Sequence, residues 1–136
     1  MKKKYIIALD QGTSSSRAVL FNKAGEIIAI EQQEIEQIFP KPGWVEHNCK
    51  EILESQTLVF HNLLVKNSIS ASEIDSIGIT NQRETTVIWN KKTGEPICNA
   101  IVWQDKRTSN LCSKLKSAGH EEHFKKSCGL VIDSYF

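Results

Sequence analysis

A short polar segment near the start of the sequence, Asp10–Arg17, combines the residue types that bind phosphate groups. Successive backbone N–H groups in a tight turn can form a concavity that holds an anion. A guanidinium group adds a fixed positive charge that suits phosphate. The side-chain donors of this segment are the hydroxyls and guanidinium of Thr13, Ser14, Ser15 and Arg17. The segment is therefore a candidate phosphate-binding turn.

Two further residues of this segment extend the interpretation. Asp10 ends an apolar run and could hold a hydrated Mg²⁺, which needs few protein carboxylates because it keeps several of its waters. Gly12 would allow a positive φ angle and a close approach of the ligand to the backbone. The same residues also fit an ordinary serine-rich hairpin turn. Neither a Walker A pattern nor a GxGxxG fingerprint is present, and both interpretations remain open.

Later polar residues could bind hydroxyl groups. Arg83 and Glu84 follow a predicted strand, and together they can donate and accept hydrogen bonds. Trp103, which opens the segment Trp103–Asp105, offers a flat apolar wall for a carbon chain. On residue types alone, an exposed ion pair and a core tryptophan are the simpler explanations of these residues. Tyr135 carries no local signal of its own.

The elements that must position these residues alternate between strands and helices. Strands over 5–10, 17–21 and 26–31 are separated by short turns, which predicts an antiparallel meander whose first strands are buried on both faces. A helix follows Asn48, which has Glu51 at the spacing of a capping box. The later predicted elements are a helical turn over 70–73, a buried strand over 76–80, strands over 85–89 and 97–103, and helices over 104–118 and 121–127.

This order of elements predicts an α/β domain built around a mixed sheet. Polar residues recur where the predicted strands end, at Asp10, at Arg83–Glu84 and at Gln104–Asp105. In open α/β sheets the ligand crevice lies at such strand ends. We therefore expect these polar residues to take part in a ligand site.

The composition excludes several classes of protein. The chain has 136 residues, enough for one ordinary domain. Its 17 basic and 16 acidic residues are dispersed and give a net charge of +1, which argues against nucleic-acid binding. No apolar run approaches the roughly 18 residues of a membrane span. The apolar stretch before Asp10 is too short for a signal peptide, so we expect a cytoplasmic protein.

The cysteine and histidine residues do not predict a metal site. The four cysteines form no CxxC pair, and reduced thiols are the simplest account of them. His120 and His123 are separated by two glutamates, which is not the HExxH arrangement of zinc enzymes. We expect these histidines on a solvated helix face.

Taken together, the motifs resemble those of the glycerol kinases, a group within the FGGY family of carbohydrate kinases. The resemblance runs from the first predicted strand to the last residue. The Asn81–Thr85 segment is typical of glycerol kinases rather than of xylulose or gluconate kinases. The matching segments are Ile7–Arg17, Pro40–His47, Gly78–Thr85, Ala100–Gln104 and Gly129–Phe136.

The resemblance implies an RNase H-like fold, the ATPase domain type of actin and hexokinase. Residues 1–136 would be an incomplete N-terminal domain, the first of two in the family. The implied reaction is transfer of the γ-phosphate of ATP to glycerol, which gives sn-glycerol 3-phosphate in glycerol catabolism. The resemblance also implies a role for each candidate residue: Thr13, Ser14, Ser15 and Arg17 at the nucleotide phosphates, Asp10 near Mg²⁺, and Arg83, Glu84, Trp103 and Tyr135 at glycerol.

The departure from the family is length, because its members are several times longer. By resemblance, the general base and the adenine pocket come from the later part of such proteins. We therefore expect this chain to be inactive alone and its full-length counterpart to form a homo-oligomer. We also expect an exposed sheet edge and self-association. The alternatives are a non-catalytic binding module, an FGGY kinase for another sugar and, more remotely, an actin-like assembly protein.

Overall fold

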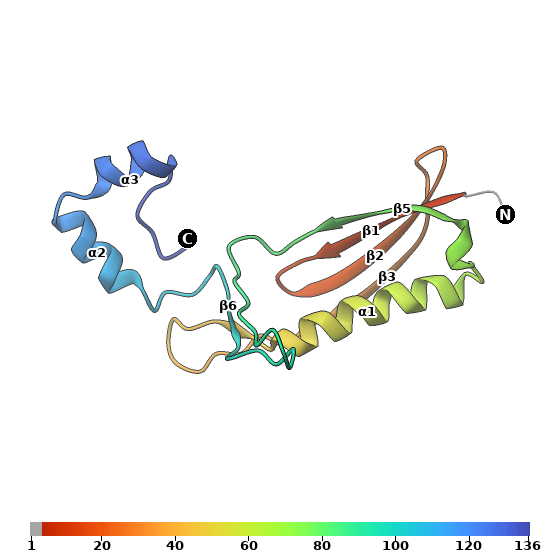
Figure 1. The fold of residues 1–136 in the computed structure, drawn as a ribbon, viewed down its shortest axis with the longest axis horizontal. Coiled ribbons are helices and arrows are strands. Elements are labelled where there is room, and N and C mark those ends of the chain that lie inside the picture. The colour runs from red at the N-terminus through yellow and green to blue at the C-terminus, as the bar shows by residue number, and fades with distance from the viewer. Residues whose placement is uncertain (1–3) are drawn as a thin grey trace. The chain divides into compact units, whose positions relative to one another are not determined.

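The computed structural model describes residues 4–136, which divide into two compact units (Figure 1). The first, called here the sheet unit, holds the described residues up to Glu36 together with His47–Gln82. The second, called the loop-rich unit, holds Gln37–Glu46 and Arg83–Phe136.

A mixed sheet forms the body of the sheet unit (Figure 1). Its strands are β1 (Tyr5–Gln11), β2 (Ser15–Asn22), β3 (Ile27–Glu34) and β5 (Ile74–Thr80), in the order β3-β2-β1-β5. β1 and β3 both run antiparallel to β2, whereas β5 runs parallel to β1. The predicted meander and the mixed sheet are confirmed.

One helix, α1 (Cys49–Lys66), lies along one face of this sheet (Figure 1). The side chain of Asn48 caps it by accepting hydrogen bonds from the N–H groups of Lys50 and Glu51. The carboxylate of Glu51 accepts from the backbone N–H of Glu36 instead of completing the predicted capping box. The buried core between helix and sheet consists of Ile7, Ala18, Leu20, Val59 and Leu63.

The predicted helical turn over 70–73 is confirmed as a 3₁₀ helix, η1 (Ala71–Glu73). Here a complete capping box does form, because Ser70 and Glu73 each bond to the other's backbone. The turn leads directly into β5.

Two expectations about burial are wrong. The face of the sheet opposite α1, called here the open face, carries Ile6, which is 41% exposed, so β1 is not buried on both sides. The strand over 76–80 is exposed rather than buried, and Ile79 is 78% exposed. The reason is that α1 packs over β1, β2 and β3, whereas β5 has β1 as its only neighbour among the described strands.

Regular structure is sparse in the loop-rich unit. The short strands β4 (Glu46–His47) and β6 (Ala100–Ile101) pair with each other. The strands predicted over 85–89 and 97–103 are wrong apart from β6, since only isolated bridges join Thr86 to Ile101 and Trp89 to Pro96. Apolar side chains of these segments stay exposed, among them Ile88, Trp89 and Ile97, so no packing holds an extended ladder.

Two helices complete the loop-rich unit, α2 (Ser109–Ser117) and α3 (Glu121–Cys128). The prediction that a helix begins at Gln104 is wrong, because the backbone N–H of Asp105 closes a turn with the carbonyl of Val102. The α3 helix is confirmed and ends at Gly129, whose φ of 75° is the left-handed conformation of a helix stop. The four cysteines remain thiols, as predicted. Within residues 4–136, each helix is too short or too polar to cross a membrane.

Candidate active site

The candidate phosphate-binding turn connects β1 to β2 at one end of the sheet unit. The N–H of Gly12 donates to the carbonyl of Ser15 at 2.9 Å, and the carbonyl of Ser14 accepts from the N–H of Ile35 at 3.0 Å. The prediction of a positive φ at Gly12 is wrong. Glycine is favoured for a different reason, because a Cβ atom there would lie 3.0 Å from the Ser15 carbonyl oxygen.

The base of this turn is fixed by buried hydroxyl groups. The hydroxyl of Ser16, in a fully buried residue, lies 2.9 Å from the side-chain oxygen of Gln11 and 2.7 Å from the hydroxyl of Ser55 on α1. Ser15 is buried as well, whereas Ser14 is exposed. The turn therefore has a rigid base and presents Thr13 and Ser14 at its tip.

Asp10 and Arg17 lie in one cross-strand row on the open face. The row runs from Thr80 through Asp10 and Arg17 to Gln32, because these residues are successive register partners on β5, β1, β2 and β3. Arg17 lies 4.0 Å from the Asp10 carboxylate, and its Nε donates to the Gln32 side chain at 3.1 Å. Both charged side chains are more than 40% exposed, so their mutual attraction is weak and a ligand can reach them.

The other predicted residues lie in the loop-rich unit, which contains a pocket of about 240 Å³. Glu84, Trp103 and Tyr135 all line it. The rings of Trp103 and Tyr135 meet edge to face with centroids 5.3 Å apart, and Tyr135 meets Phe136 in the same way at 5.0 Å. The pocket thus has an aromatic wall and a carboxylate. We call it the polyol pocket after the hydroxyl-binding chemistry predicted for it.

Glu84 has an unusual backbone conformation in this pocket. Its φ of 57° lies in the left-handed region, which costs a residue other than glycine about 1–3 kcal/mol. Such strain clusters at ligand-binding sites, where surrounding structure holds it in place. Arg83, predicted to act beside Glu84, is exposed and is not part of the pocket lining. The structure therefore brings together Glu84, Trp103 and Tyr135 but leaves Arg83 outside this group.

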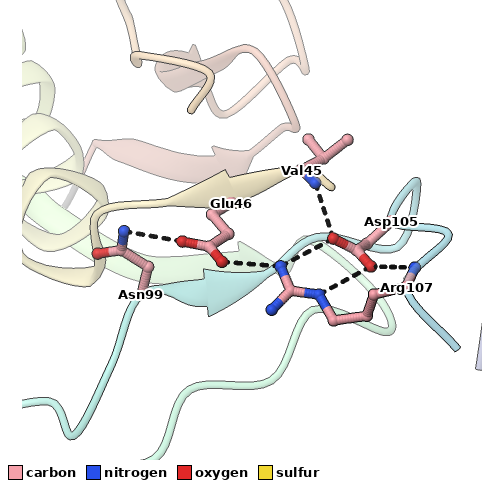
Figure 2. A network of polar contacts seen from close by, with 5 residues as sticks. All are labelled: Val45, Glu46, Asn99, Asp105 and Arg107. Atoms are coloured by element: carbon pink, nitrogen blue, oxygen red, sulfur yellow. Dashed lines mark hydrogen bonds and ion pairs between the residues drawn. The ribbon is translucent and has the colours of Figure 1, made fainter. Parts of the chain in front are cut away.

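Figure 2 shows a charged network, of which two residues, Asp105 and Arg107, line the polyol pocket. Arg107 binds both carboxylate oxygens of Asp105, through Nε and a terminal nitrogen, each at 2.9 Å. That terminal nitrogen also donates to Glu46 at 2.8 Å, and the second oxygen of Glu46 accepts from Asn99 at 3.1 Å. Asp105 is 2% exposed and accepts a further bond from the N–H of Val45 at 2.7 Å.

These contacts keep the network ionised. Hydrogen bonds from Arg107 and Asn99 hold the pKa of Glu46 below its usual value. Burial alone would raise the pKa of Asp105, but the hydrogen bonds from Arg107 and Val45 outweigh it and lower the pKa. Hydrogen bonds to Asp105 and Glu46 raise the pKa of Arg107. Asp105 and Arg107 line the pocket as a fixed ion pair rather than as a titrating acid and base.

Sequence reasoning found Asp105 only as a polar residue at a strand end, and it missed Glu46 and Arg107 as site residues. Glu46 and its partner Arg107, like Val45 and its partner Asp105, are about sixty positions apart along the chain. No local spacing could therefore have revealed the network. The one local signal is the Asp-x-Arg spacing of Asp105 and Arg107, which lets an aspartate accept from a backbone N–H two residues later.

Comparison with known proteins decides the family. Residues 5–136 match the N-terminal domain of the FGGY family of carbohydrate kinases. The chain belongs to this family. Glycerol kinases from Desulforamulus reducens and Halalkalibacterium halodurans are each 57% identical to it over 136 residues. These 136 residues are the whole of this chain but 27% of each relative, so the chain spans about a quarter of their length.

Solved structures of the family share its fold. The glycerol kinase of Plasmodium falciparum with ADP superposes with a TM-score of 0.88 at 30% identity, covering 100% of this chain and 28% of that one. The gluconate kinase of Lactobacillus acidophilus gives a TM-score of 0.87 at 23% identity, covering 97% and 26%, a likeness that concerns the fold alone. The predicted fold class, an α/β domain of the actin and hexokinase type, is confirmed.

Proposed function

We propose that this FGGY chain is the N-terminal part of a glycerol kinase, which transfers the γ-phosphate of ATP to glycerol and yields sn-glycerol 3-phosphate and ADP. The observation that carries the proposal is the polyol pocket, where Glu84, Trp103 and Tyr135 converge. The 57% identity to glycerol kinases along the whole chain supports the choice of substrate.

The polyol pocket suits a small chain of carbons that carries hydroxyl groups. The carboxylate of Glu84 accepts hydrogen bonds from hydroxyls, and the guanidinium of Arg83 donates them once a substrate bridges the two residues. Trp103 and Tyr135 present apolar ring surface to the carbon chain. The edge-to-face contact between these rings fixes the wall in advance, so little ordering is needed when glycerol binds.

The turn after β1 suits the nucleotide. Thr13, Ser14 and Ser15 supply hydroxyl and backbone donors to phosphate oxygens, and Arg17 supplies positive charge. The Plasmodium falciparum relative that was crystallised with ADP supports nucleotide binding by the fold. In phosphoryl transfer, positioning and charge stabilisation supply most of the rate, and these residues contribute to both.

Asp10 fits a carboxylate that holds Mg²⁺ through water. Its side chain is 44% exposed beside the phosphate-binding turn, so a hydrated ion can reach it. Among the described residues, no three acidic, histidine or cysteine side chains gather into a ligand set. A site at Asp10 would therefore use waters and phosphate oxygens for its other ligands, as Mg²⁺ commonly does with nucleotides. Bound Mg²⁺ would neutralise charge on the transferring phosphate.

The whole enzyme needs more than this chain. Of the two carboxylates that line the polyol pocket, Asp105 is engaged by Arg107, which leaves Glu84 to bind substrate. The general base and the adenine site belong to a further part of the protein. Residues 1–136 are then one portion of an N-terminal domain in a cytoplasmic, homo-oligomeric enzyme of glycerol catabolism, with neither a nucleic-acid nor a membrane partner.

Two other functions remain as competing proposals. The first is a binding module without catalysis. The second is a related FGGY kinase for a larger sugar, such as xylulose or gluconate. The 57% identity to glycerol kinases along the whole chain argues against a larger sugar.

A chimera distinguishes these possibilities. Residues 1–136 would replace the matching segment of the Halalkalibacterium halodurans glycerol kinase, and ADP release would be measured with ATP, Mg²⁺ and glycerol. The unmodified relative and the 136-residue chain alone are the controls. We expect turnover by the chimera and none by the chain alone.

The choice of substrate follows from the same assay with xylulose and gluconate. Preference for either sugar over glycerol would favour the related kinase. A chimera that has the relative's circular dichroism and oligomeric state but does not turn over any of the three would favour the binding module.

A further inference from the structure

Trp103, whose ring meets Tyr135 in the aromatic wall, is part of a tight turn. The carbonyl of Val102 accepts from the N–H of Asp105 at 2.8 Å, which places Trp103 and Gln104 between the two ends of the turn. The turn is anchored to Val45 at both ends. The N–H of Val102 donates to the Val45 carbonyl at 3.0 Å, and the Val45 N–H donates to the Asp105 carboxylate at 2.7 Å.

The anchor at Asp105 depends on Arg107. A carboxylate that is 2% exposed is costly unless its charge is compensated, and Arg107 compensates it with a two-point contact. The backbone N–H of Arg107 adds a third bond to the same carboxylate at 2.7 Å. Without the guanidinium, Asp105 would keep only backbone donors for a buried negative charge.

Arg107 is itself held from two other directions. The guanidinium of Arg107 donates to the Glu46 carboxylate at 2.8 Å (Figure 2). The guanidinium carbon also lies 3.8 Å from the centre of the Trp44 ring. Stacking on Trp44 and a two-point contact with Asp105 both need the planar guanidinium, which a lysine does not supply. These contacts hold Arg107 in one orientation, and through its bonds to Asp105 it holds the turn in place.

We infer that Arg107 is a positioning residue for the polyol pocket: by joining Asp105 to Glu46 it fixes the turn that presents Trp103 to the substrate. This inference rests on the proposed function for the identity of the substrate. Arg107 acts through Trp103, so it affects how tightly the polyol is held. The phosphate-binding turn of the sheet unit contains none of these residues, and nucleotide binding is expected to be unaffected.

The kinetic test uses the chimera carrying Arg107→Gln or Arg107→Lys. Lys91→Gln, which removes an exposed positive charge from the same unit, is the matched control. We expect Arg107→Gln to raise the KM for glycerol about tenfold or more, since small misplacements of a site residue are costly. Arg107→Lys should resemble Arg107→Gln, while the KM for ATP and all constants of Lys91→Gln stay unchanged.

A double-mutant cycle tests whether Arg107 acts through Trp103. In a Trp103→Ala background, Arg107→Gln should add little to the KM for glycerol, because the side chain that it positions is absent. Independent, multiplicative effects of the two substitutions would overturn the inference. So would an equal rise in the KM for ATP, or wild-type behaviour of Arg107→Lys.

A spectroscopic test does not depend on activity. The indole N–H signal of Trp103, assigned by its loss in Trp103→Phe, should broaden or shift in Arg107→Lys and stay in place in Lys91→Gln. An unchanged signal would contradict the positioning role even if the chimera were inactive. An inactive chimera whose signal moves as expected would instead count against the proposed function, and so the two failures are distinguishable.

Discussion

In the sheet unit, apolar side chains from β1, β2 and α1 pack into a continuous core, with Ile7, Leu20 and Leu63 fully buried. In the loop-rich unit, the fully buried apolar residues are few, and the best-connected buried group is the carboxylate of Asp105. The first unit thus depends on hydrophobic burial, which has no preferred direction. The second depends on hydrogen bonds and an ion pair, whose geometry is strict.

This difference matches what each unit has to position. The phosphate-binding turn only needs a rigid base, which two paired strands and the buried Ser16 hydroxyl provide. The polyol pocket needs separate loops to meet at fixed orientations, although those loops contain little regular structure. A polar network can fix loops in this way because each contact specifies a direction as well as a distance.

Of all the changes that we predict, truncation of Leu63 should lower stability the most, because it removes core packing from the sheet unit. Leu63→Ala removes a fully buried side chain from the core and should lower the free energy of unfolding by about 2–5 kcal/mol. Leu53→Ala is the matched control, because it makes the same change on the same helix at a residue that is 70% exposed. That control should cost within about 0.5 kcal/mol.

Amide hydrogen exchange would show where the loss occurs. Exchange of the β1 and β2 amides should become faster in Leu63→Ala, whereas the amides around β6 should change less. Equal losses in Leu63→Ala and Leu53→Ala would mean that the core does not stabilise the sheet unit as described.

Lowering the pH should affect the two units in sequence. In the sheet unit, burial lowers the pKa of His47 below 6.5, although the polar side chain of Gln82 and the charge of Glu51 oppose the shift. The unfolded chain therefore takes up a proton first, and this unit loses stability as the pH falls below about 6.5. In the loop-rich unit, the pKa values of Glu46 and Asp105 are lowered, so their contribution is present above their unfolded values of 4.5 and 3.8.

The carboxylate contribution is lost progressively as the pH falls below these unfolded values and through the lowered values of the folded state. Amide exchange at pH 7.5, 5.5 and 3.5 would test this order, with protection lost first around α1 and later around β6. The variant His47→Gln should abolish the first step and leave the second. Simultaneous loss in both units would contradict the separation.

The same contrast explains what could be predicted from the sequence. The strands and helix of the sheet unit were predicted because apolar residues recur there at strand and helix spacing, as Val59 and Leu63 do on α1. In the loop-rich unit the segments over 85–89 and 97–103 have a similar apolar content, but they remain irregular, and Ile88 and Ile97 stay largely exposed. Local pattern cannot reveal whether a packing partner exists.

The candidate site divides in the same way. Asp10, Thr13 and Arg17 follow directly from one contiguous segment, so the sequence alone identified them as candidates. Tyr135 had no local signal, and only the resemblance to glycerol kinases made it a candidate for binding glycerol. Arg107 was missed altogether, because its role depends on contacts with Glu46 and Trp44 that are distant in sequence.

A pair of glycine substitutions gives the smallest expected change and tests the phosphate-binding turn itself. Gly12→Ala would place a Cβ atom 3.0 Å from the Ser15 carbonyl oxygen, so the turn must shift, at a cost of about 1 kcal/mol. Gly78→Ala meets no atom within 4 Å and should stabilise the protein by about 0.4–1 kcal/mol by restricting the unfolded chain. Urea unfolding measures both changes. In the chimera, Gly12→Ala should also raise the KM for ATP without changing that for glycerol, the reverse of the result expected for Arg107. If Gly12→Ala were as stable as Gly78→Ala and bound ATP normally, the closed turn would not be what positions the phosphate donors.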